Sequence, residues 1–202
     1  MLYQLSYAPG GTPELPVAKY PTHPCRRQPA SIPARRPLPA RQRQPMNTQQ
    51  VLQRLDAAWA GFEDSYAGLA DAQLLTPGVQ GGWSVRDIIA HVTWWEEESL
   101  THLPLIRDGG RPPRYSVTYG GIDAFNALMT ERRRHLSLGE VLRQHREVHD
   151  RLLDYVRAAP GALFTRETRF RRRLRLDTYA HYPLHARAIR AWRARSLGGP
   201  TA

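Results

Sequence analysis

The spacing of apolar residues is the feature that most constrains what this chain can fold into. From residue 46 onward, apolar side chains recur at steps of three and four, which is the period of an α-helix. Each such helix has an apolar stripe that it must bury against another element. The pattern therefore predicts an all-α fold, a four-helix bundle, with long helices near residues 48–69, 84–106, 137–159 and 177–195 and a shorter one near 122–129.

Capping residues indicate where three of these helices begin. Asn47 precedes the first periodic stretch and is a good N-cap. Ser84 is followed three residues later by Asp87, and Ser137 by Glu140, a spacing typical of a capping box.

The first quarter of the chain has a different character. Residues 1–45 contain ten of the seventeen prolines and a net charge of +6 out of +11, with no helical or strand period. We predict that this basic, proline-rich extension is disordered. We interpret Met46 as the natural start and residues 46–197 as the folded domain. The open alternative is a natural arm that binds nucleic acid or an acidic surface.

Composition limits the cellular location and the kinds of chemistry that we expect for this chain. The single cysteine, Cys25, excludes an internal disulfide, so a reducing, cytoplasmic location is the default expectation. No stretch approaches the ~20 apolar residues of a membrane-spanning helix, and we expect no membrane partner. The sequence contains no phosphate-binding loop, dinucleotide glycine motif or recognisable Ser-His-Asp order.

Histidine spacing points to a metal site. His181 and His185 lie four residues apart, which stacks two imidazoles on one helical face. His91 lies on the inward face of the second predicted helix and can supply a third ligand. Three neutral imidazoles leave room for water or substrate on a metal ion, but they do not name the metal. His145 and His149 repeat the same spacing, so the pair alone is weak evidence and a core role stays open.

Two stretches of the sequence resemble a known family. Residues 82–91, GWSVRDIIAH, resemble the second-helix motif of the DinB-like superfamily, and residues 178–192, TYAHYPLHARAIRAW, resemble its fourth-helix motif. Residues 121–126 and 132–153 are closer to the ClbS/DfsB branch. The resemblance covers about residues 46–196 and implies an up-down-down-up four-helix bundle, often a homodimer.

The resemblance also implies a site and a range of activities. In metal-binding members, the positions that correspond to His91, His181 and His185 hold a divalent ion, commonly zinc or nickel. Some members resemble transferases and isomerases that use a low-molecular-weight thiol. The ClbS branch includes a self-resistance protein that opens an electrophilic ring without a metal.

Pro183 is a departure from the simplest pattern, because it lies between the two histidines of the fourth predicted helix. Proline inside a helix removes one hydrogen bond and clashes with the preceding turn. Either the helix kinks there, or it begins near Tyr182 and leaves His181 outside, which would loosen the histidine triad. We expect the kinked helix, because Asp177 and Thr178 are good N-caps.

The function that follows is a metal-dependent thiol transferase or hydrolase acting on a small electrophile, in detoxification or stress defence. Glu98 is the candidate general base, or a partner that orients a metal ligand, because it lies two turns beyond His91 on the same face. A solvated or ion-paired side chain is the open alternative for Glu98. Tyr182 is a second candidate catalytic residue that could line the pocket, with a place in the core as the open alternative. The alternative is a ClbS-like protein that protects by metal-independent reaction or sequestration.

An arginine-rich segment offers a competing interpretation. Six arginines fall within residues 166–175, and we expect residues 162–176 to form a loop or a short extended piece. Such a cluster could bind nucleic acid or an anionic thiol. Aromatic residues are sparse among these arginines. Lysine is nearly absent from the whole chain, which indicates a compositional bias toward arginine and not a selection of arginine for phosphate recognition. We therefore do not expect nucleic acid to be the main partner.

Overall fold

The computed structural model describes residues 45–196, and the described part of the chain is all-helical with no strands. Four elements make up the long helices of the bundle: α1 (Thr48–Tyr66), α3 (Val85–Arg107), α6 (Leu138–Ala158) and α8 (Tyr182–Ser196). The others are α2 (Asp71–Leu74), α4 (Tyr115–Thr118), α5 (Ile122–Arg133), a 3₁₀ turn at Gly161–Leu163 and α7 (Arg169–Asp177).

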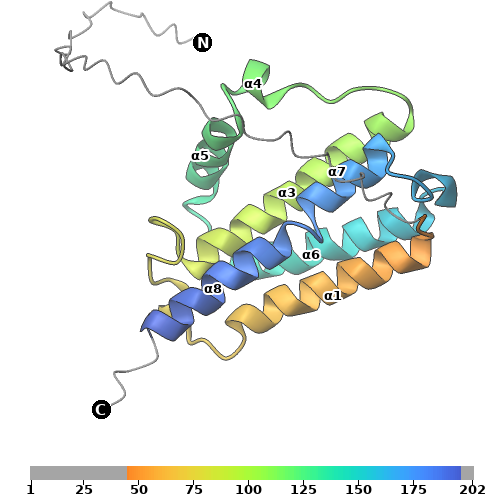
Figure 1. The fold of residues 1–202 in the computed structure, drawn as a ribbon. Coiled ribbons are helices and arrows are strands. Elements are labelled where there is room, and N and C mark those ends of the chain that lie inside the picture. The colour runs from red at the N-terminus through yellow and green to blue at the C-terminus, as the bar shows by residue number, and fades with distance from the viewer. Residues whose placement is uncertain (1–44, 197–202) are drawn as a thin grey trace, which may run out of the picture. The chain divides into compact units, whose positions relative to one another are not determined.

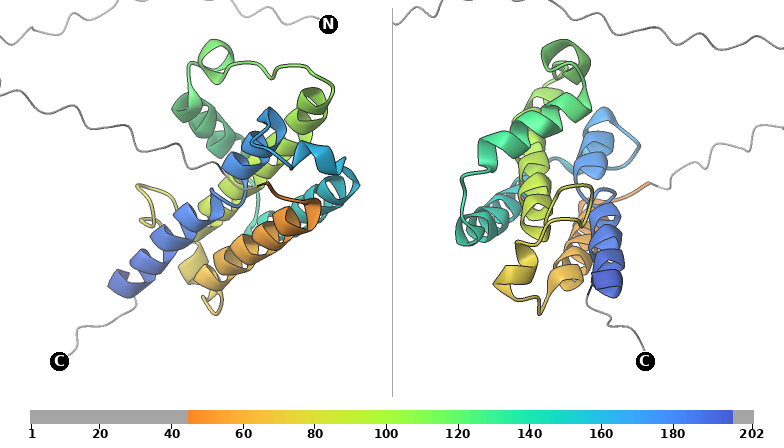
Figure 2. Two further views of the ribbon diagram at one scale, coloured as in Figure 1. Left: turned by 45° about the vertical axis from the view of Figure 1, so that its right-hand side comes forward. Right: turned by 90° about the vertical axis from the view of Figure 1, so that its left-hand side faces the viewer.

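The long helices form an up-down-down-up bundle, as expected. In Figure 1, α1 runs opposite to α3 and α6, and α7 followed by α8 runs back in the direction of α1. Helix α3 packs against α6 and α7, while α1 packs against α8 and α6. Because α3 and α6 are parallel, a long crossover joins them. It carries α4 and α5, and α5 packs alongside α3 (Figure 2).

The predicted caps are confirmed at all three helix starts. Asn47 accepts a hydrogen bond from the backbone N–H of Gln50, and the capping boxes at Ser84 and Ser137 are both formed. These interactions satisfy backbone donors that a helix start would otherwise leave unpaired. The second predicted helix, from Ser84 to about residue 106, matches α3 closely.

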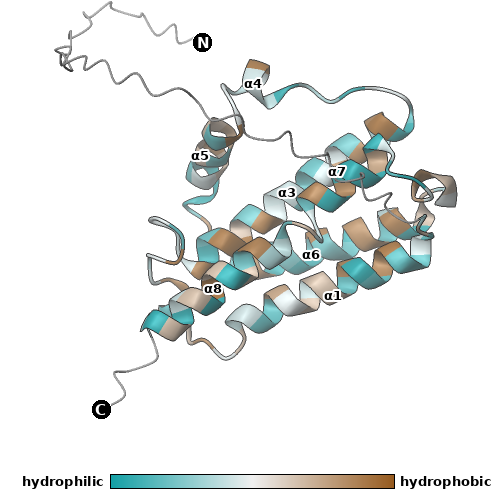
Figure 3. Ribbon diagram, in the orientation of Figure 1, coloured by the Kyte–Doolittle hydropathy of each residue, from teal (hydrophilic) through white to brown (hydrophobic). Residues whose placement is uncertain are grey.

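The core lies between the four long helices. Brown apolar bands alternate with teal polar bands along each helix in Figure 3, as the three-and-four spacing requires. The largest fully buried apolar side chains come from several helices. They include Phe62 of α1, Trp94 of α3, Phe125 of α5, Leu152 of α6 and Phe170 of α7.

The arginine-rich segment is a helix, so the prediction of a loop or extended piece over residues 162–176 was wrong for most of it. Thr168 is the N-cap of α7 and accepts a hydrogen bond from the backbone N–H of Arg171 at 3.0 Å. Phe170 and Leu174, one turn apart, are both buried. The guanidinium of Arg171 is also buried and donates to the carbonyl of Phe164 at 3.1 Å. The arginines for which we expected a loop or an extended piece therefore belong to an amphipathic helix.

The expectation of one kinked fourth helix was also wrong. Helix α7 ends at Asp177, a turn spans residues 178–181, and α8 begins at Tyr182, so His181 lies just outside the helix. The backbone N–H groups of His181 and Tyr182 both donate to the carbonyl of Thr178, at 2.6 and 2.9 Å. Pro183 is the second residue of α8, where its missing N–H breaks no helical hydrogen bond.

Two other expectations concern the ends of the chain and the membrane. The predicted disorder of residues 1–45 lies almost wholly outside the described residues, and the boundary at Met46 stays a prediction. Met46 itself has a buried side chain in the core. Within residues 45–196, no helix has the length and apolar character needed to cross a membrane.

Candidate metal centre

Three histidines converge between α3 and the start of α8. The Nε2 atom of His181 lies 3.0 Å from that of His91 and 2.9 Å from that of His185. One nitrogen from each of the three residues lies within 4.8 Å of the others, and this is the one such group of three potential ligands within residues 45–196. The structure therefore brings together the three residues that the sequence indicated, although His181 comes from a turn.

The contacts between these nitrogens suit a cation better than a hydrogen-bond network. Each Nε2 of a neutral imidazole carries either one hydrogen or one lone pair. Because the Nε2 of His181 faces two other Nε2 atoms, it cannot satisfy both contacts with a single proton. A metal ion accepts all three lone pairs. Tetrahedral zinc with Zn–N of about 2.0–2.1 Å separates its ligand nitrogens by about 3.3 Å, so the two Nε2 contacts of His181 need to lengthen by only a few tenths of an ångström.

The imidazoles are held in the neutral form that binds metals. Burial lowers the pKa of His185 to about 3, and the neighbouring His181 adds to that effect. Burial likewise lowers the pKa of His181 to about 4, against the opposing influence of the Asp177 backbone. The pKa of His91 is lowered strongly by burial and by the other two imidazoles. Near neutral pH the three rings are therefore uncharged, and no second proton has to leave a ring before a cation binds.

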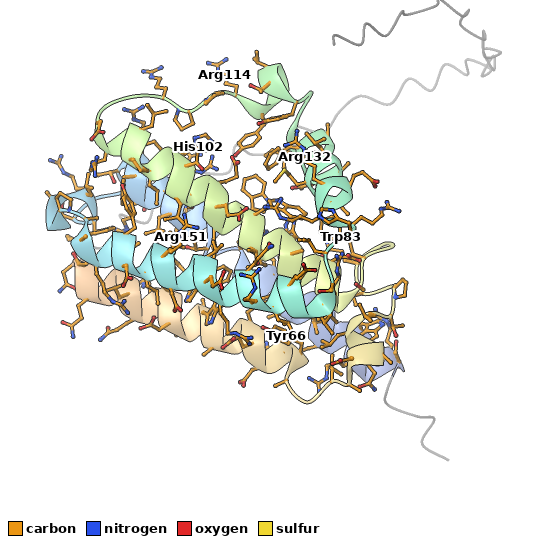
Figure 4. All side chains as sticks on the ribbon, turned by 180° about the vertical axis from the view of Figure 1, so that it is seen from behind. Tyr66, Trp83, His102, Arg114, Arg132 and Arg151 are labelled. Atoms are coloured by element: carbon orange, nitrogen blue, oxygen red, sulfur yellow. The ribbon has the colours of Figure 1, made fainter. Side chains whose placement is uncertain are left out.

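Tryptophan rings surround His91. The rings of Trp83 and Trp94 lie 4.8 and 4.7 Å from the His91 ring, and Trp95 lies 6.1 Å from the ring of His181. His91 and His185 are only 4% and 6% exposed, whereas His181 is half-buried. The tryptophan rings thus cover His91, and His181 is the most exposed member of the triad. Figure 4 shows Trp83 at the end of the molecule where α3 begins.

Glu98 is engaged away from the triad. Its carboxylate accepts hydrogen bonds from the His102 imidazole at 3.0 Å and from the Tyr115 hydroxyl, and Arg173 lies 3.8 Å away. Burial opposes ionisation of Glu98, but the hydrogen bonds from His102 and Tyr115 outweigh it and lower the pKa. Among the described residues, no hydrogen bond or ion pair joins Glu98 to the three histidines. Its role as general base stays a prediction that this geometry does not favour.

Tyr182 faces the core rather than an open pocket. It is fully buried, and its hydroxyl donates to the Oε1 atom of Glu96. The same oxygen accepts a hydrogen bond from the Nδ1 of His149 at 2.9 Å. Sequence reasoning missed this network, although Glu96 lies four residues after the buried Val92 and could have been recognised as an acid on the inward face of α3.

His145 and His149 are core residues and do not form a second metal group. Trp59 stacks on both rings, with centroids 4.0 Å from His145 and 3.5 Å from His149. The hydroxyl of Thr93 donates to a backbone carbonyl, so it accepts from the Nδ1 of His145 at 3.1 Å. The repeated His-x-x-x-His spacing therefore has two different structural meanings in one chain.

Taken together, the fold and the triad define a class: a four-helix bundle in which one histidine of the second long helix, one of the turn before the last helix and one of the last helix meet at a potential metal site. The sequence matches the family model of the DinB superfamily over residues 25–187, and the chain belongs to that superfamily. No curated protein matches the sequence.

Solved structures with the same fold include proteins of the ClbS/DfsB branch. The DfsB structure, described as a sibling lethal factor precursor, has a TM-score of 0.63 at 18% identity and covers 74% of this chain and 96% of that one. The colibactin self-resistance protein ClbS, in complex with a double-stranded DNA, has a TM-score of 0.62 at 11% identity, with 78% and 99% covered. An uncharacterised Escherichia coli UTI89 protein has a TM-score of 0.63 at 13% identity, with 76% and 96% covered.

These likenesses show the fold alone, because the identities are low. They do bear on one expectation. A structural neighbour in complex with DNA does not support our expectation that nucleic acid is not a main partner of this protein.

Proposed function

We propose that His91, His181 and His185 bind one divalent transition-metal ion, zinc or nickel, and that the protein uses it to act on a small electrophilic compound. The observation that carries this proposal is the convergence of three imidazoles, two of them buried and one half-buried, whose Nε2 contacts of 2.9 and 3.0 Å cannot all be satisfied by protons. The proposed setting is detoxification or stress defence in the cytoplasm, with the protein as a homodimer.

The residues of this chain supply the surroundings for that chemistry. A bound ion of this kind lowers the pKa of a water or thiol that it contacts. Three protein ligands leave at least one position open for such a group. Trp83 and Trp94 exclude water from the side of His91, which strengthens electrostatic interactions at the site. The half-buried His181 leaves one side accessible to a low-molecular-weight thiol and its electrophile.

Metal content of the purified full chain, prepared without a histidine tag, tests the proposal. We expect about one equivalent of zinc or nickel by mass spectrometry, lost in His91→Ala. The matched control is His145→Ala, which removes another buried helical histidine outside the triad and should retain the metal. A folded wild-type protein that takes up neither ion would contradict the proposal.

Thiol transfer and hydrolysis are distinguished by their products. Metal-loaded protein is incubated with an alkyl halide electrophile, with and without a cysteine-based thiol. A thioether that forms only with the thiol supports transfer, whereas an alcohol that forms without it supports hydrolysis.

A resistance role that needs no metal is the alternative. The structural neighbour described as a self-resistance protein supports the resistance part of it. In that case the metal-free protein would react with the electrophile, or sequester it, as well as the loaded protein does. The comparison of metal-free and metal-loaded samples in the same assay separates the two possibilities.

Binding of DNA is a second candidate, favoured by the arrangement of exposed arginines. Arg169 of α7 donates to the carbonyls of Gly109 and Gly110 at 3.2 and 3.0 Å, which holds α7 beside the connection after α3. Both segments carry exposed arginines, among them Arg114 (Figure 4) and Arg172. Fluorescence anisotropy with a labelled duplex should show affinity that falls as salt increases. An absence of binding at low salt would exclude this candidate.

A further inference from the structure

A chain of buried polar contacts crosses the bundle next to the histidine triad. Trp59 of α1 stacks on His149 of α6, with ring centroids 3.5 Å apart and planes 8° from parallel. His149 donates to Glu96 of α3 at 2.9 Å, and Tyr182 of α8 donates to the same carboxylate oxygen. One residue from each of the four long helices therefore takes part in this chain of contacts.

The bond between Glu96 and Tyr182 joins the two segments that carry the triad. Glu96 lies five residues after His91 on α3, and Tyr182 directly follows His181 and precedes His185 by three residues. Both side chains are fully buried. A fixed distance between Glu96 and Tyr182 therefore fixes the distance between the helix of His91 and the turn of His181.

The turn at residues 178–181 is the part of the site that most needs such a contact. It is not helical, and Pro183 provides no backbone N–H at the start of α8. The backbone hydrogen bonds of His181 and Tyr182 go to Thr178 of the same turn. They hold the turn together but do not set its position relative to α3.

Glu96 is suited to that task because it is itself rigidly held. It has no solvent exposure, and the stacked His149 fixes one oxygen as the acceptor. Its Oε2 atom has no hydrogen-bond partner within the described residues. A buried acid with so few partners is costly to the fold, so its hydrogen bonds to Tyr182 and His149 are strong constraints on geometry.

We propose that Glu96 and Tyr182 are positioning residues, whose buried hydrogen bond sets the distance between His91 and the His181–His185 pair. This inference rests on the proposed metal site. It also changes the expected role of Tyr182, which acts from the core side of the triad and not on the substrate.

Metal affinity of the full chain gives the first test. Tyr182→Phe removes the hydroxyl and keeps the ring. The matched control is Tyr155→Phe, because the hydroxyl of Tyr155 on α6 is buried without a hydrogen-bond partner. Competition for Co²⁺ against a chromophoric chelator should show a loss of about 10- to 100-fold in Tyr182→Phe, and no such loss in the control. The visible Co²⁺ spectrum should change in Tyr182→Phe only, because it reports ligand geometry.

Metal-free protein gives a second readout that does not depend on the metal proposal. The His91 and His181 ring centroids lie 4.9 Å apart, close enough for nuclear Overhauser contacts between their protons. These contacts should weaken in Tyr182→Phe and persist in Tyr155→Phe. If wild-type protein takes up no Co²⁺, the metal proposal fails and the ring contacts still decide the positioning role.

Glu96→Gln is a conservative second variant, which separates loss of the hydrogen bond to Tyr182 from a general disturbance of the core. It keeps the Oε1 acceptor for Tyr182 and His149, so its ring contacts should stay closer to wild type than those of Tyr182→Phe. Circular dichroism melts of the metal-free variants confirm that each is folded. Unchanged His91–His181 contacts, or unchanged Co²⁺ affinity, in folded Tyr182→Phe would overturn the positioning role.

Discussion

His145 shows how a single buried side chain links stability to pH. It is 1% exposed, and its Nε2 has no hydrogen-bond partner within the described residues. Burial lowers the pKa from 6.5 to about 3, with smaller contributions from His149 and Arg146. The unfolded chain therefore binds a proton between pH 6.5 and 3 that the folded chain refuses. The contribution of His145 to the free energy of unfolding is therefore fully present above pH 6.5 and is lost as the pH falls toward 3.

Replacing His145 with Gln tests this linkage. Over pH 6 to 5, wild-type stability should fall more steeply than that of His145→Gln, by about 1.4 kcal/mol per pH unit, because one proton is involved. Urea unfolding at several pH values measures both slopes. His135→Gln, at an exposed position, is the control and should follow wild type. Parallel slopes for wild type and His145→Gln would contradict the neutral, buried state.

At the level of elements, features that depend on neighbouring residues could be predicted from the sequence. Features that depend on packing between distant helices could not. Ser84 and Ser137 cap their helices through residues three positions away, so the sequence locates them. Helix α7 depends on burying Phe170 and Leu174 against distant helices, while its composition suggests a loop. Helix α7 ends before His181 because of that packing and because of Pro183. The cap preferences of Asp177 and Thr178 therefore predicted the wrong start for the last helix.

Pro183→Ala tests the separation of α7 and α8. Because Pro183 is in the first turn of α8, the substitution should change the free energy of unfolding by less than about 1 kcal/mol. A proline within one continuous helix costs about 3 kcal/mol, so its removal there would be strongly stabilising. Thermal melts of the two proteins measure the difference, and a large increase in stability would favour the kinked helix.

Arg86 connects the start of α3 to the end of α5. Its guanidinium donates to the carbonyls of Arg133 at 2.7 Å and Leu136, and it pairs with Asp87 at 2.8 Å. A lysine cannot span these acceptors with one ammonium group. Arg86→Lys should lower the free energy of unfolding by about 1–3 kcal/mol in urea titrations. The exposed Arg132→Lys on α5 is the control, and an equal effect of both would argue against this role.

For the whole molecule, the histidine triad could be predicted because each of its members lies in a short sequence motif. The hydrogen bond between Glu96 and Tyr182 next to the triad could not be predicted. His181 and His185 are four apart, and His91 belongs to an equally local stretch. The contact between Glu96 and Tyr182 spans 86 positions of sequence. No local pattern pairs a buried acid with a tyrosine at that distance, since only the packing of α3 against α8 brings them together.

Metal binding should stabilise the whole bundle, because the proposed ligands come from α3 and from the last segment of the chain. An ion that binds only the folded state adds about 2.7 kcal/mol at a free concentration of 100 times Kd. For a domain of this size, that corresponds to an increase in Tm of about 5–10 °C. Differential scanning calorimetry with and without Zn²⁺ should show the increase in wild type and in His145→Gln, but not in His185→Ala. The same increase in His185→Ala would mean that zinc binds elsewhere, whereas no increase in wild type would leave the fold without the proposed ion.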